Sequence, residues 1–198
     1  EIEGEGHSYW FNITNLTDDT NQSASLRNCY AAGDERKALI SYVSAGTNVR
    51  LMPKFMDTKS TTYNVIGNDQ ILLRYADVLL MYAEALNEIS HDASAGSVAL
   101  KHLNDVRMRS GVAGLSATEL PDKESFRRAV LDERQREFPY EGQRWFDLVR
   151  MGYAKEAMKV EGIDIQDYQL LFPIPQTEME KVGNTSILWQ NPGYDSAN

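Results

Sequence analysis

Apolar residues recur at helical spacing between residues 69 and 87. One stripe has successive spacings of 3, 4, 3 and 4 and contains Leu72, Tyr75, Leu79, Tyr82 and Leu86. A second stripe lies beside it and contains Leu73, Ala76, Leu80 and Ala83. The remaining polar edge is narrow and contains Arg74, Asp77, Glu84 and Glu88. This pattern predicts an amphipathic helix that is covered on two sides.

Three further helices are predicted after this one. The second runs over residues 94–109, ends at Gly111 and turns four residues inward, namely Ala95, Ala99, Leu103 and Val106. The third begins near the N-cap residue Asp122, and the fourth covers residues 143–151. The fold class is therefore mainly α, with two TPR-like helix pairs. Two pairs are fewer than a freestanding helical solenoid needs, which points to an absent packing partner.

The two ends of the chain lack helical periodicity. Residues 1–68 are rich in Asn, Thr, Ser, Gly and Asp, and alternation over residues 39–43 and 49–51 predicts one short β-hairpin there. After Gly152 the prolines at 173 and 175 favour an extended path, residues 176–182 fit a turn of helix, and the tail at 189–194 is expected to be pinned down. We expect an irregular segment at 1–68, a helical scaffold at 69–151 and an irregular segment at 152–198 that packs back on the helices.

Charged and aromatic residues are interleaved between Glu133 and Gly152, where a solvated helix would separate them. The apolar stripe of the third predicted helix, continued by steps of three and four, lands on Glu133 and Glu137. A buried carboxylate must find a cation or take up a proton. The nearest cations are Arg144 and Arg150 on the next helix, beside Trp145, which is expected in the core. We therefore expect a structural charge clamp between two helices that meet at residues 138–142, formed by Glu133, Glu137, Arg144, Asp147 and Arg150.

A catalytic alternative exists for the two glutamates. Glycosidases use two carboxyl groups about 5 to 10 Å apart as acid and base. Arginines crowd Glu133 and Glu137, however, and would lower their pKa values and keep both groups ionised. The structural interpretation is favoured, and Glu133→Gln is expected to damage folding more than any activity.

Composition excludes several classes of function. The net charge of −9 and the absence of a basic patch argue against a nucleic-acid partner. Cys29 is the only cysteine, so the chain has no internal disulfide or multi-cysteine metal site, and we expect a buried small residue. Its three histidines, at positions 7, 91 and 102, lack metal-ligand spacing. No cofactor and no metal are predicted, and no apolar run is long enough to span a membrane.

Five segments, in this order, together resemble one known family. They are LLRYADVLLMYAEALNE at 72–88, LNDVRMRSGV at 103–112, LDERQREFPYEGQRWFDLVRMG at 131–152, LLFPIP at 170–175 and QNPGY at 190–194. Asp34-Glu35-Arg36 matches an upstream Asp-x-Arg of the same family. The chain resembles the C-terminal portion of the SusD/RagB outer-membrane glycan-binding lipoproteins, and the long block at 131–152 is the most specific of these motifs.

The resemblance implies a fold, a partner and a location. It implies a TPR-like scaffold of which this chain is one partial domain, and a non-enzymatic protein of Bacteroidetes that holds oligosaccharide or another nutrient above a SusC-type TonB-dependent transporter. It also implies an extracellular position on the outer membrane, through an N-terminal lipid anchor that these 198 residues lack. No binding residue of the family is transferred to this chain.

Chemistry alone suggests one ligand-binding candidate. Sugar recognition uses exposed aromatic rings beside polar side chains that bind hydroxyls. Tyr9, Trp10 and Asn12 have this composition, as do their neighbours Phe11 and Asn15. Adjacent aromatic residues also anchor irregular loops, so both interpretations stay open.

Three functions remain in competition. The first is a glycan-binding accessory protein. The second is an enzyme of the same surface system, a glycosidase or a peptidase, although the sequence has neither an H-E-x-x-H nor a G-x-S-x-G motif. The third is a TPR-like adaptor that binds a protein partner and no sugar.

Overall fold

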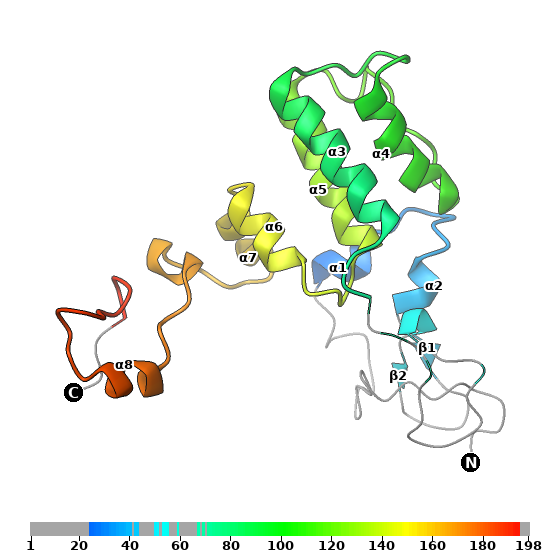
Figure 1. Cartoon of the computed structure of the whole chain (residues 1–198). Coiled ribbons are helices and arrows are strands. Elements are labelled where there is room, and N and C mark those ends of the chain that lie inside the picture. The colour runs from blue at the N-terminus through cyan, green and yellow to red at the C-terminus, as the bar shows by residue number, and fades with distance from the viewer. Residues whose placement is uncertain are drawn as a thin grey trace. The chain divides into compact units, whose positions relative to one another are not determined.

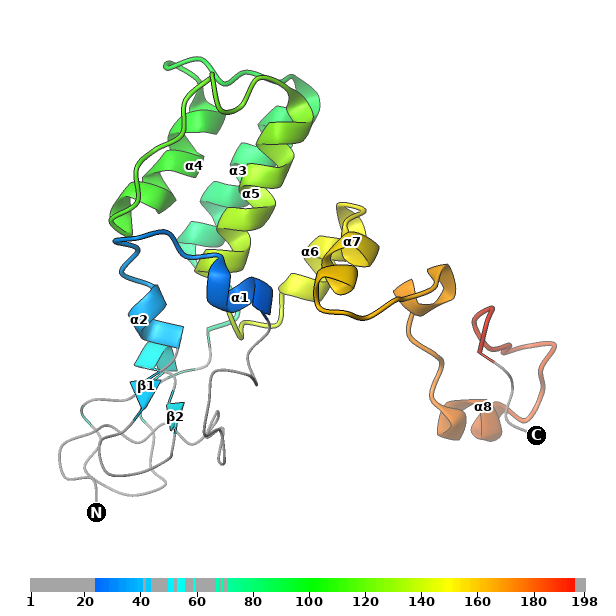
Figure 2. The same ribbon diagram turned by 180° about the vertical axis from the view of Figure 1, so that it is seen from behind.

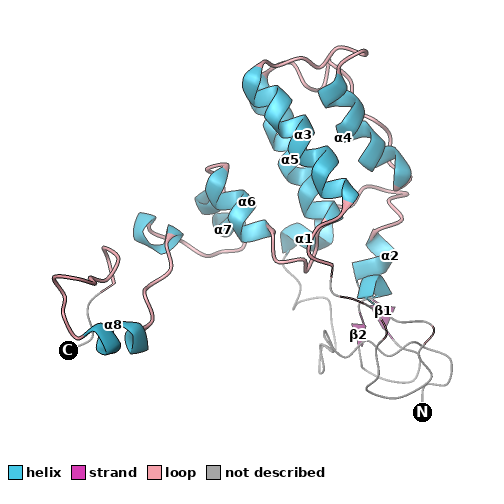
Figure 3. Cartoon of the chain, viewed as in Figure 1, coloured by secondary structure: helices cyan, strands magenta, loops and turns pink. Residues whose placement is uncertain are grey.

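The computed structural model describes residues 24–40, 42–43, 50–51, 53–55, 59, 67, 69 and 71–194. The chain forms two compact units, residues 1–144 and residues 145–198. Helices predominate in the described residues of both units, which confirms the mainly α fold class (Figure 1, Figure 3). The division at residues 68 and 151 stays a prediction.

Three long helices form the core of the first unit. They are α3 (Tyr75–Ile89), α4 (Val98–Arg109) and α5 (Lys123–Glu137), and α3 packs against both of the others (Figure 1, Figure 2). Ala83 on α3 and Ala99 on α4 are buried, whereas Ala85 and Ala95, which the sequence also suggested as small packing residues, are exposed. The largest fully buried apolar side chains of these helices are Leu80, Leu103, Val106, Phe126 and Val130.

The ends of these helices follow from local sequence. Asp122 caps α5 by accepting a hydrogen bond from the Ser125 amide, while the Ser125 hydroxyl lies 3.1 Å from the amide of Asp122, so the predicted N-cap is confirmed. Helix α5 ends at Glu137, two residues before Pro139, also as predicted. Helix α4 begins four residues later than expected, because Ser97 is its N-cap and Ala95 lies exposed in the preceding turn.

Among the residues that the structure describes, helix α3 is covered on one side only, so the prediction of two buried stripes is wrong. The stripe of Ala76, Leu80 and Ala83 is buried, whereas Tyr75 in the other stripe is 74% exposed and Tyr82 is half exposed. Apolar spacing shows that a helix face is suited to burial, but it does not supply the element that covers it. Asp77, expected on the polar edge, is buried as well and pairs with Arg134 at 2.6 Å.

The predicted hairpin strands are present before α3. Strand β1 (Tyr42–Val43) pairs antiparallel with β2 (Arg50–Leu51), with Tyr42 opposite Leu51. Three short helices in this part were not predicted, namely α1 (Ala24–Asn28), α2 (Lys37–Ile40) and η2 (Pro53–Phe55). Helices of three to five residues are too short to show a hydrophobic period, so the sequence could not reveal them.

The second unit contains short elements and a small core. Helix α6 (Arg144–Arg150) leads into it, followed by α7 (Ala154–Val160), η3 (Asp167–Leu170) and α8 (Gln176–Val182). Helices α6 and α8 match the prediction, and α7 was missed. Trp145, expected in the core, is only half-buried, with its ring centroid 6.4 Å from that of Phe172. The tail is pinned as predicted, since the Tyr194 hydroxyl donates to the Leu171 carbonyl at 2.8 Å.

Candidate functional site: a buried cluster of ion pairs

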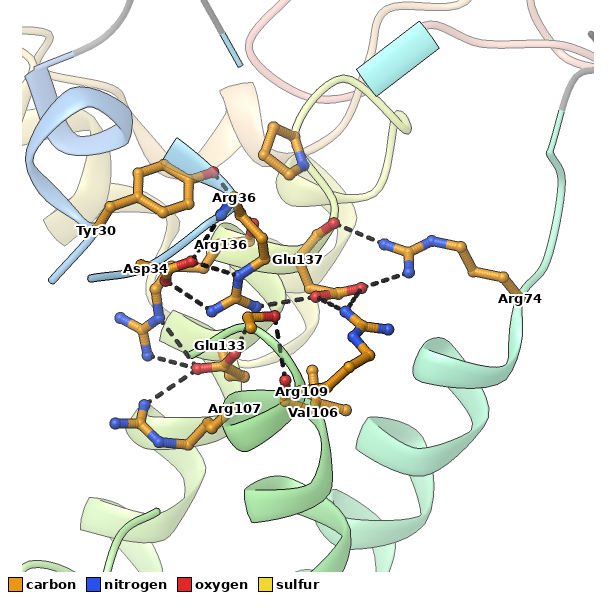
Figure 4. Close-up of polar contacts among 12 residues, drawn as sticks. Tyr30, Asp34, Arg36, Arg74, Val106, Arg107, Arg109, Glu133, Arg136 and Glu137 are labelled. Atoms are coloured by element: carbon orange, nitrogen blue, oxygen red, sulfur yellow. Dashed lines mark hydrogen bonds and ion pairs between the residues drawn. The ribbon is translucent and has the colours of Figure 1, made fainter. Parts of the chain in front are cut away.

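Glu133 and Glu137 lie one turn apart on the inward face of α5. Glu133 is 0% exposed and Glu137 is 4% exposed, which confirms that the apolar stripe of this helix continues onto two carboxylates. Each of them contacts guanidinium groups from other parts of the first unit (Figure 4). The burial is therefore compensated by charge pairing.

Arg36 is the cation that both glutamates share. Its Nη1 lies 2.6 Å from Glu133 Oε1 and 2.9 Å from Glu137 Oε2. Asp34, whose side chain is fully buried, accepts from Nε and Nη2 of the same guanidinium at 2.9 and 2.8 Å. This two-point contact fixes the plane of the guanidinium and directs Nη1 at α5.

The backbone on either side of Asp34 lies close to the end of α4, and this places Asp34 and Arg36 beside the long helices. The Glu35 amide donates to the Ser110 carbonyl at the end of α4, at 3.1 Å. Gly111 lies beside this contact, and a Cβ atom there would stand 2.9 Å from the Gly33 carbonyl oxygen. Gly111 also has a φ of +78°, so any side chain at this position would be both strained and obstructed.

Four more arginines complete the cluster. Arg107 and Arg136 contact Glu133 Oε2 at 3.1 and 2.9 Å. Arg109 donates from Nη2 to both carboxylate oxygens of Glu137, at 2.6 and 2.7 Å, and Arg74 also pairs with Glu137. These side chains come from the C-terminal end of α4, the N-cap of α3 and α5 itself, as Figure 4 shows. The cluster thus joins every long helix of the first unit.

The electrostatics of the cluster favour the ionised carboxylate. Burial by itself would raise the pKa of Glu137, but hydrogen bonds from Arg109 and Arg74 outweigh this effect and hold the pKa below its usual value. A general acid needs a raised pKa so that it carries a proton near neutral pH. Glu137 is therefore unsuited to act as a general acid.

A second set of cations lies at the C-terminal end of α5. Lys54 Nζ donates to the carbonyls of Glu137 and Pro139 at 2.9 and 3.2 Å, and it pairs with the carboxylate of Glu141. Arg74 also donates to the Glu137 carbonyl at 2.6 Å, and its guanidinium carbon lies 4.4 Å from the centre of the Phe138 ring. Positive charge at this end of a helix complements the helix dipole and satisfies the last carbonyl groups.

The arginines that contact Glu133 and Glu137 in the structure differ from Arg144 and Arg150, which the sequence suggested. Arg144 donates to the Leu131 carbonyl at 3.1 Å and to Gln135 Oε1 at 2.8 Å. Asp147 is buried, and its Oδ1 pairs with Arg150 at 2.7 Å within the same short helix. The cations on Glu133 and Glu137 include arginines up to 101 residues away in sequence, so proximity along the chain was a poor guide.

Some of the residues that pair with Glu133 and Glu137 belong to motifs noted in the sequence, and others do not. Arg107 and Arg109 stand in the VRMR segment, and Asp34 and Arg36 in the Asp-x-Arg pair, both of which the sequence singles out. Lys54 was missed, because it lies in a polar stretch without periodicity. Arg74 was expected on a solvated edge, and its role as a shared partner of Glu137 and Glu141 was not foreseen.

The other candidate residues, for ligand binding, nucleophilic chemistry and metal binding, say less about function. Tyr9, Trp10 and Asn12 lie outside the described residues. Cys29 is half-buried, its thiol donates to the Leu26 carbonyl, and burial raises its pKa to about 11, so it is a poor nucleophile. In the described part of the chain, no group of three or more His, Cys, Asp or Glu side chains is arranged to hold a metal ion. None of the described helices is both long and apolar enough to cross a bilayer.

All of the cluster except Asp34, together with the three long helices around it, lies within a stretch that matches a known family. The SusD family model matches residues 35–194, which begins just before Arg36 and ends at the pinned Tyr194. The chain belongs to the SusD family.

Two curated members of the SusD family illustrate the relationship. SusD-like protein P2 of Formosa agariphila is 34% identical over 140 residues, which cover 65% of this chain and 26% of that protein. SusD-like protein P25 of the same organism is 30% identical over 165 residues, covering 76% of this chain and 30% of that protein. The chain thus spans between a quarter and a third of the length of these relatives.

Solved structures of SusD-like proteins also match. A laminarin-binding SusD-like protein is 25% identical with a TM-score of 0.59, over 96% of this chain and 43% of that one. A SusD-like protein from Bacteroides fragilis is 28% identical with a TM-score of 0.56, over 75% of this chain and 31% of that one. These likenesses agree with the helical SusD-like fold of the chain.

Proposed function

We propose that this chain is part of a glycan-binding accessory protein without catalytic activity. The observation that carries the proposal is membership of the SusD family, together with similarity over almost the whole chain to a SusD-like protein that binds laminarin. In this role the helices form a scaffold, and the ligand is held by residues that the scaffold supports. Oligosaccharide is the proposed ligand class.

The buried cluster supports a scaffold over a glycosidase. A pair of catalytic carboxylates needs space for a sugar between them and one carboxyl group that holds a proton. Glu133 and Glu137 are buried, and both contact the guanidinium of Arg36. We therefore assign both residues a structural role, in which they fasten α5 to α3, α4 and the segment before α2.

The partner and the location follow from the family and are part of the proposal. We propose that the protein works with a SusC-type TonB-dependent transporter in nutrient uptake. It would lie on the extracellular face of the outer membrane, held by an N-terminal lipid anchor. Binding of the purified chain to a cognate transporter, measured with and without oligosaccharide, tests this partnership.

Tyr9, Trp10 and Asn12 remain our proposed ligand-binding residues. An indole face stacks on the apolar face of a pyranose ring, and a side-chain amide binds sugar hydroxyls. Replacing Trp10 with alanine is expected to weaken laminarin binding about tenfold, if stacking contributes roughly 1.4 kcal/mol. Isothermal titration calorimetry with a panel of neutral oligosaccharides measures this change.

Trp10→Phe provides the matched control for this experiment. Because phenylalanine keeps an aromatic face, it should retain part of the affinity that alanine loses. Undiminished binding by the Trp10→Ala variant would dismiss the site while leaving glycan binding elsewhere on the protein intact.

A second candidate function is a protein-interaction scaffold, favoured by the exposed apolar face of α3. Tyr75, Val78 and Tyr82 are exposed on that face, and exposed apolar patches commonly mark protein contacts. Binding of a purified transporter by a chain that binds no oligosaccharide in the same panel would favour this function over the first.

A further inference from the structure

One buried polar atom stands apart from the rest of the described chain. The Nδ1 atom of His102, on α4, is buried without a hydrogen-bond partner, and no other buried side-chain nitrogen or oxygen of the described residues is in this state. A buried polar atom without a partner is costly, so one that persists in a folded protein is commonly satisfied by a water molecule or an ion. The neighbours of His102 decide between these two.

Asp105 places a second ligand atom beside this nitrogen. It follows His102 by three residues on α4, and this spacing puts two side chains on the same face of a helix. Asp105 Oδ2 lies 3.6 Å from His102 Nδ1. The separation is too long for a direct hydrogen bond, so the carboxylate does not satisfy the nitrogen by itself.

The separation of the two atoms suits a bridging metal ion. Zn²⁺ binds imidazole nitrogen and carboxylate oxygen at about 2.0 to 2.2 Å. Two such bonds with their outer atoms 3.6 Å apart meet at the ion at about 115 to 120°, near the tetrahedral angle of about 109°. Two hydrogen bonds of about 2.8 Å to a bridging water would meet at only about 80°. An ion therefore fits the gap better than a water molecule does.

The imidazole is held by packing, whereas the carboxylate is accessible. The ring centroid of His102 lies 5.3 Å from that of Tyr82 on α3, the helix that packs beside α4 (Figure 1). The side chain of His102 is 18% exposed and that of Asp105 is 33% exposed. A fixed imidazole loses little conformational entropy on binding, and the exposed carboxylate gives an ion a way in.

Lys101 is the group that opposes a metal ion at this position. Its Nζ lies 2.6 Å from the same oxygen of Asp105, and its side chain is 66% exposed. A bound ion would displace this ammonium group, which can move into solvent. Exposed ion pairs of this kind contribute little, so the displacement costs little.

We propose that His102 and Asp105 form a two-residue binding site for a divalent transition metal ion, with Zn²⁺ the best match and water completing its coordination. A nitrogen ligand beside a carboxylate suits Zn²⁺, whereas Mg²⁺ and Ca²⁺ take oxygen ligands. The site is separate from the proposed glycan binding. The sequence predicted no metal because its three histidines are far apart, and this site uses one histidine with one aspartate. With two protein ligands, we expect weaker binding than at structural zinc sites with four.

Isothermal titration of the whole chain with Zn²⁺ tests the site, and one ion per chain is expected. His102→Gln and Asp105→Asn should each weaken binding by more than about tenfold, because each removes one of two protein ligands. Lys101→Met should strengthen binding about twofold to fivefold, because the competing ammonium is gone. His91→Gln is the matched control and should leave the affinity unchanged, since His91 Nδ1 already lies 2.9 Å from Asn87 Oδ1.

Thermal unfolding with and without Zn²⁺ gives an independent measurement, because an ion that binds the folded chain raises its Tm. The wild type should gain stability from Zn²⁺ and His102→Gln should not, while unfolding without Zn²⁺ checks that each variant is folded. Absence of Zn²⁺ binding by the wild type overturns the proposal. Equal affinity in the wild type, Asp105→Asn and Lys101→Met also overturns it, because it would show an adventitious ion only, bound without the carboxylate.

Discussion

At the scale of single residues, Glu137 shows how a buried charge is retained. Glu137 accepts hydrogen bonds from Arg36, Arg74 and Arg109, so guanidinium groups take the place of water around its carboxylate. The sequence located this carboxylate correctly, because a helical stripe can be extended by counting. It could not name the partners, since Arg36 is 101 residues away and only the folded chain brings the two together.

Replacing Glu137 with glutamine tests the energetics of this site. The change leaves buried guanidinium groups with a neutral partner and is expected to lower the free energy of unfolding by about 2 to 3 kcal/mol at pH 7. Because the folded-state pKa of Glu137 lies below its ordinary value of 4.5, its contribution to stability is full above that pH and is lost as the pH falls toward the lowered value. Urea unfolding between pH 7 and pH 3 should therefore show a shallower pH dependence in the variant than in the wild type.

Glu124→Gln is the control for this measurement, because Glu124 lies on the same helix but is half exposed. Exposed ion pairs contribute little, so its unfolding free energy should stay within about 0.5 kcal/mol of the wild type. Equal stability of the two variants would contradict the structural role given to Glu137.

At the scale of elements, the sequence predicts those helix ends that are set by residues close together in the chain. Helix α5 begins at Asp122 and ends before Pro139 because a cap and a proline act on their immediate neighbours. Helices α1 and α2 were missed because they are too short to show a hydrophobic period and depend on tertiary contacts, such as the hydrogen bond that the Gln135 side-chain amide donates to the Ser25 hydroxyl of α1 at 3.3 Å. Local sequence therefore predicts the long helices well and the short ones poorly.

The terminal loop offers a test at this scale. Gly193→Ala places a methyl group against the Tyr168 ring, at a φ of +88° that alanine rarely adopts, so it should loosen the tail and its contact with η3. Faster hydrogen exchange of the Tyr194 amide, relative to the wild type, is the expected result. Gly96→Ala serves as control, because a Cβ atom there meets nothing within 4 Å, and it should leave this exchange unchanged.

At the scale of the whole molecule, we expect the exposed apolar face of α3 to promote self-association. Tyr75, Val78 and Tyr82 are exposed there, while the opposite face of the same helix is part of the core. Val78→Ser is expected to reduce self-association at high protein concentration, because it removes apolar surface from the patch. Its unfolding free energy should change by less than about 0.5 kcal/mol, since the two residues have similar helix propensity and the site is on the surface.

Light scattering over a concentration series measures this association. Val98→Ser is the control, because Val98 is exposed to the same degree but lies on α4. Association that is the same in Val78→Ser, Val98→Ser and the wild type would exclude this face of α3 as the contact surface.

The shared guanidinium of Arg36 also has a consequence for biosynthesis. Arg36 leaves the ribosome 97 residues before Glu133, the first of its two carboxylate partners on α5. At about 5 to 20 residues per second, it waits roughly 5 to 20 seconds in water before that partner is made. The two carboxylate contacts of Arg36 on α5 can therefore form only after α5 has been synthesised.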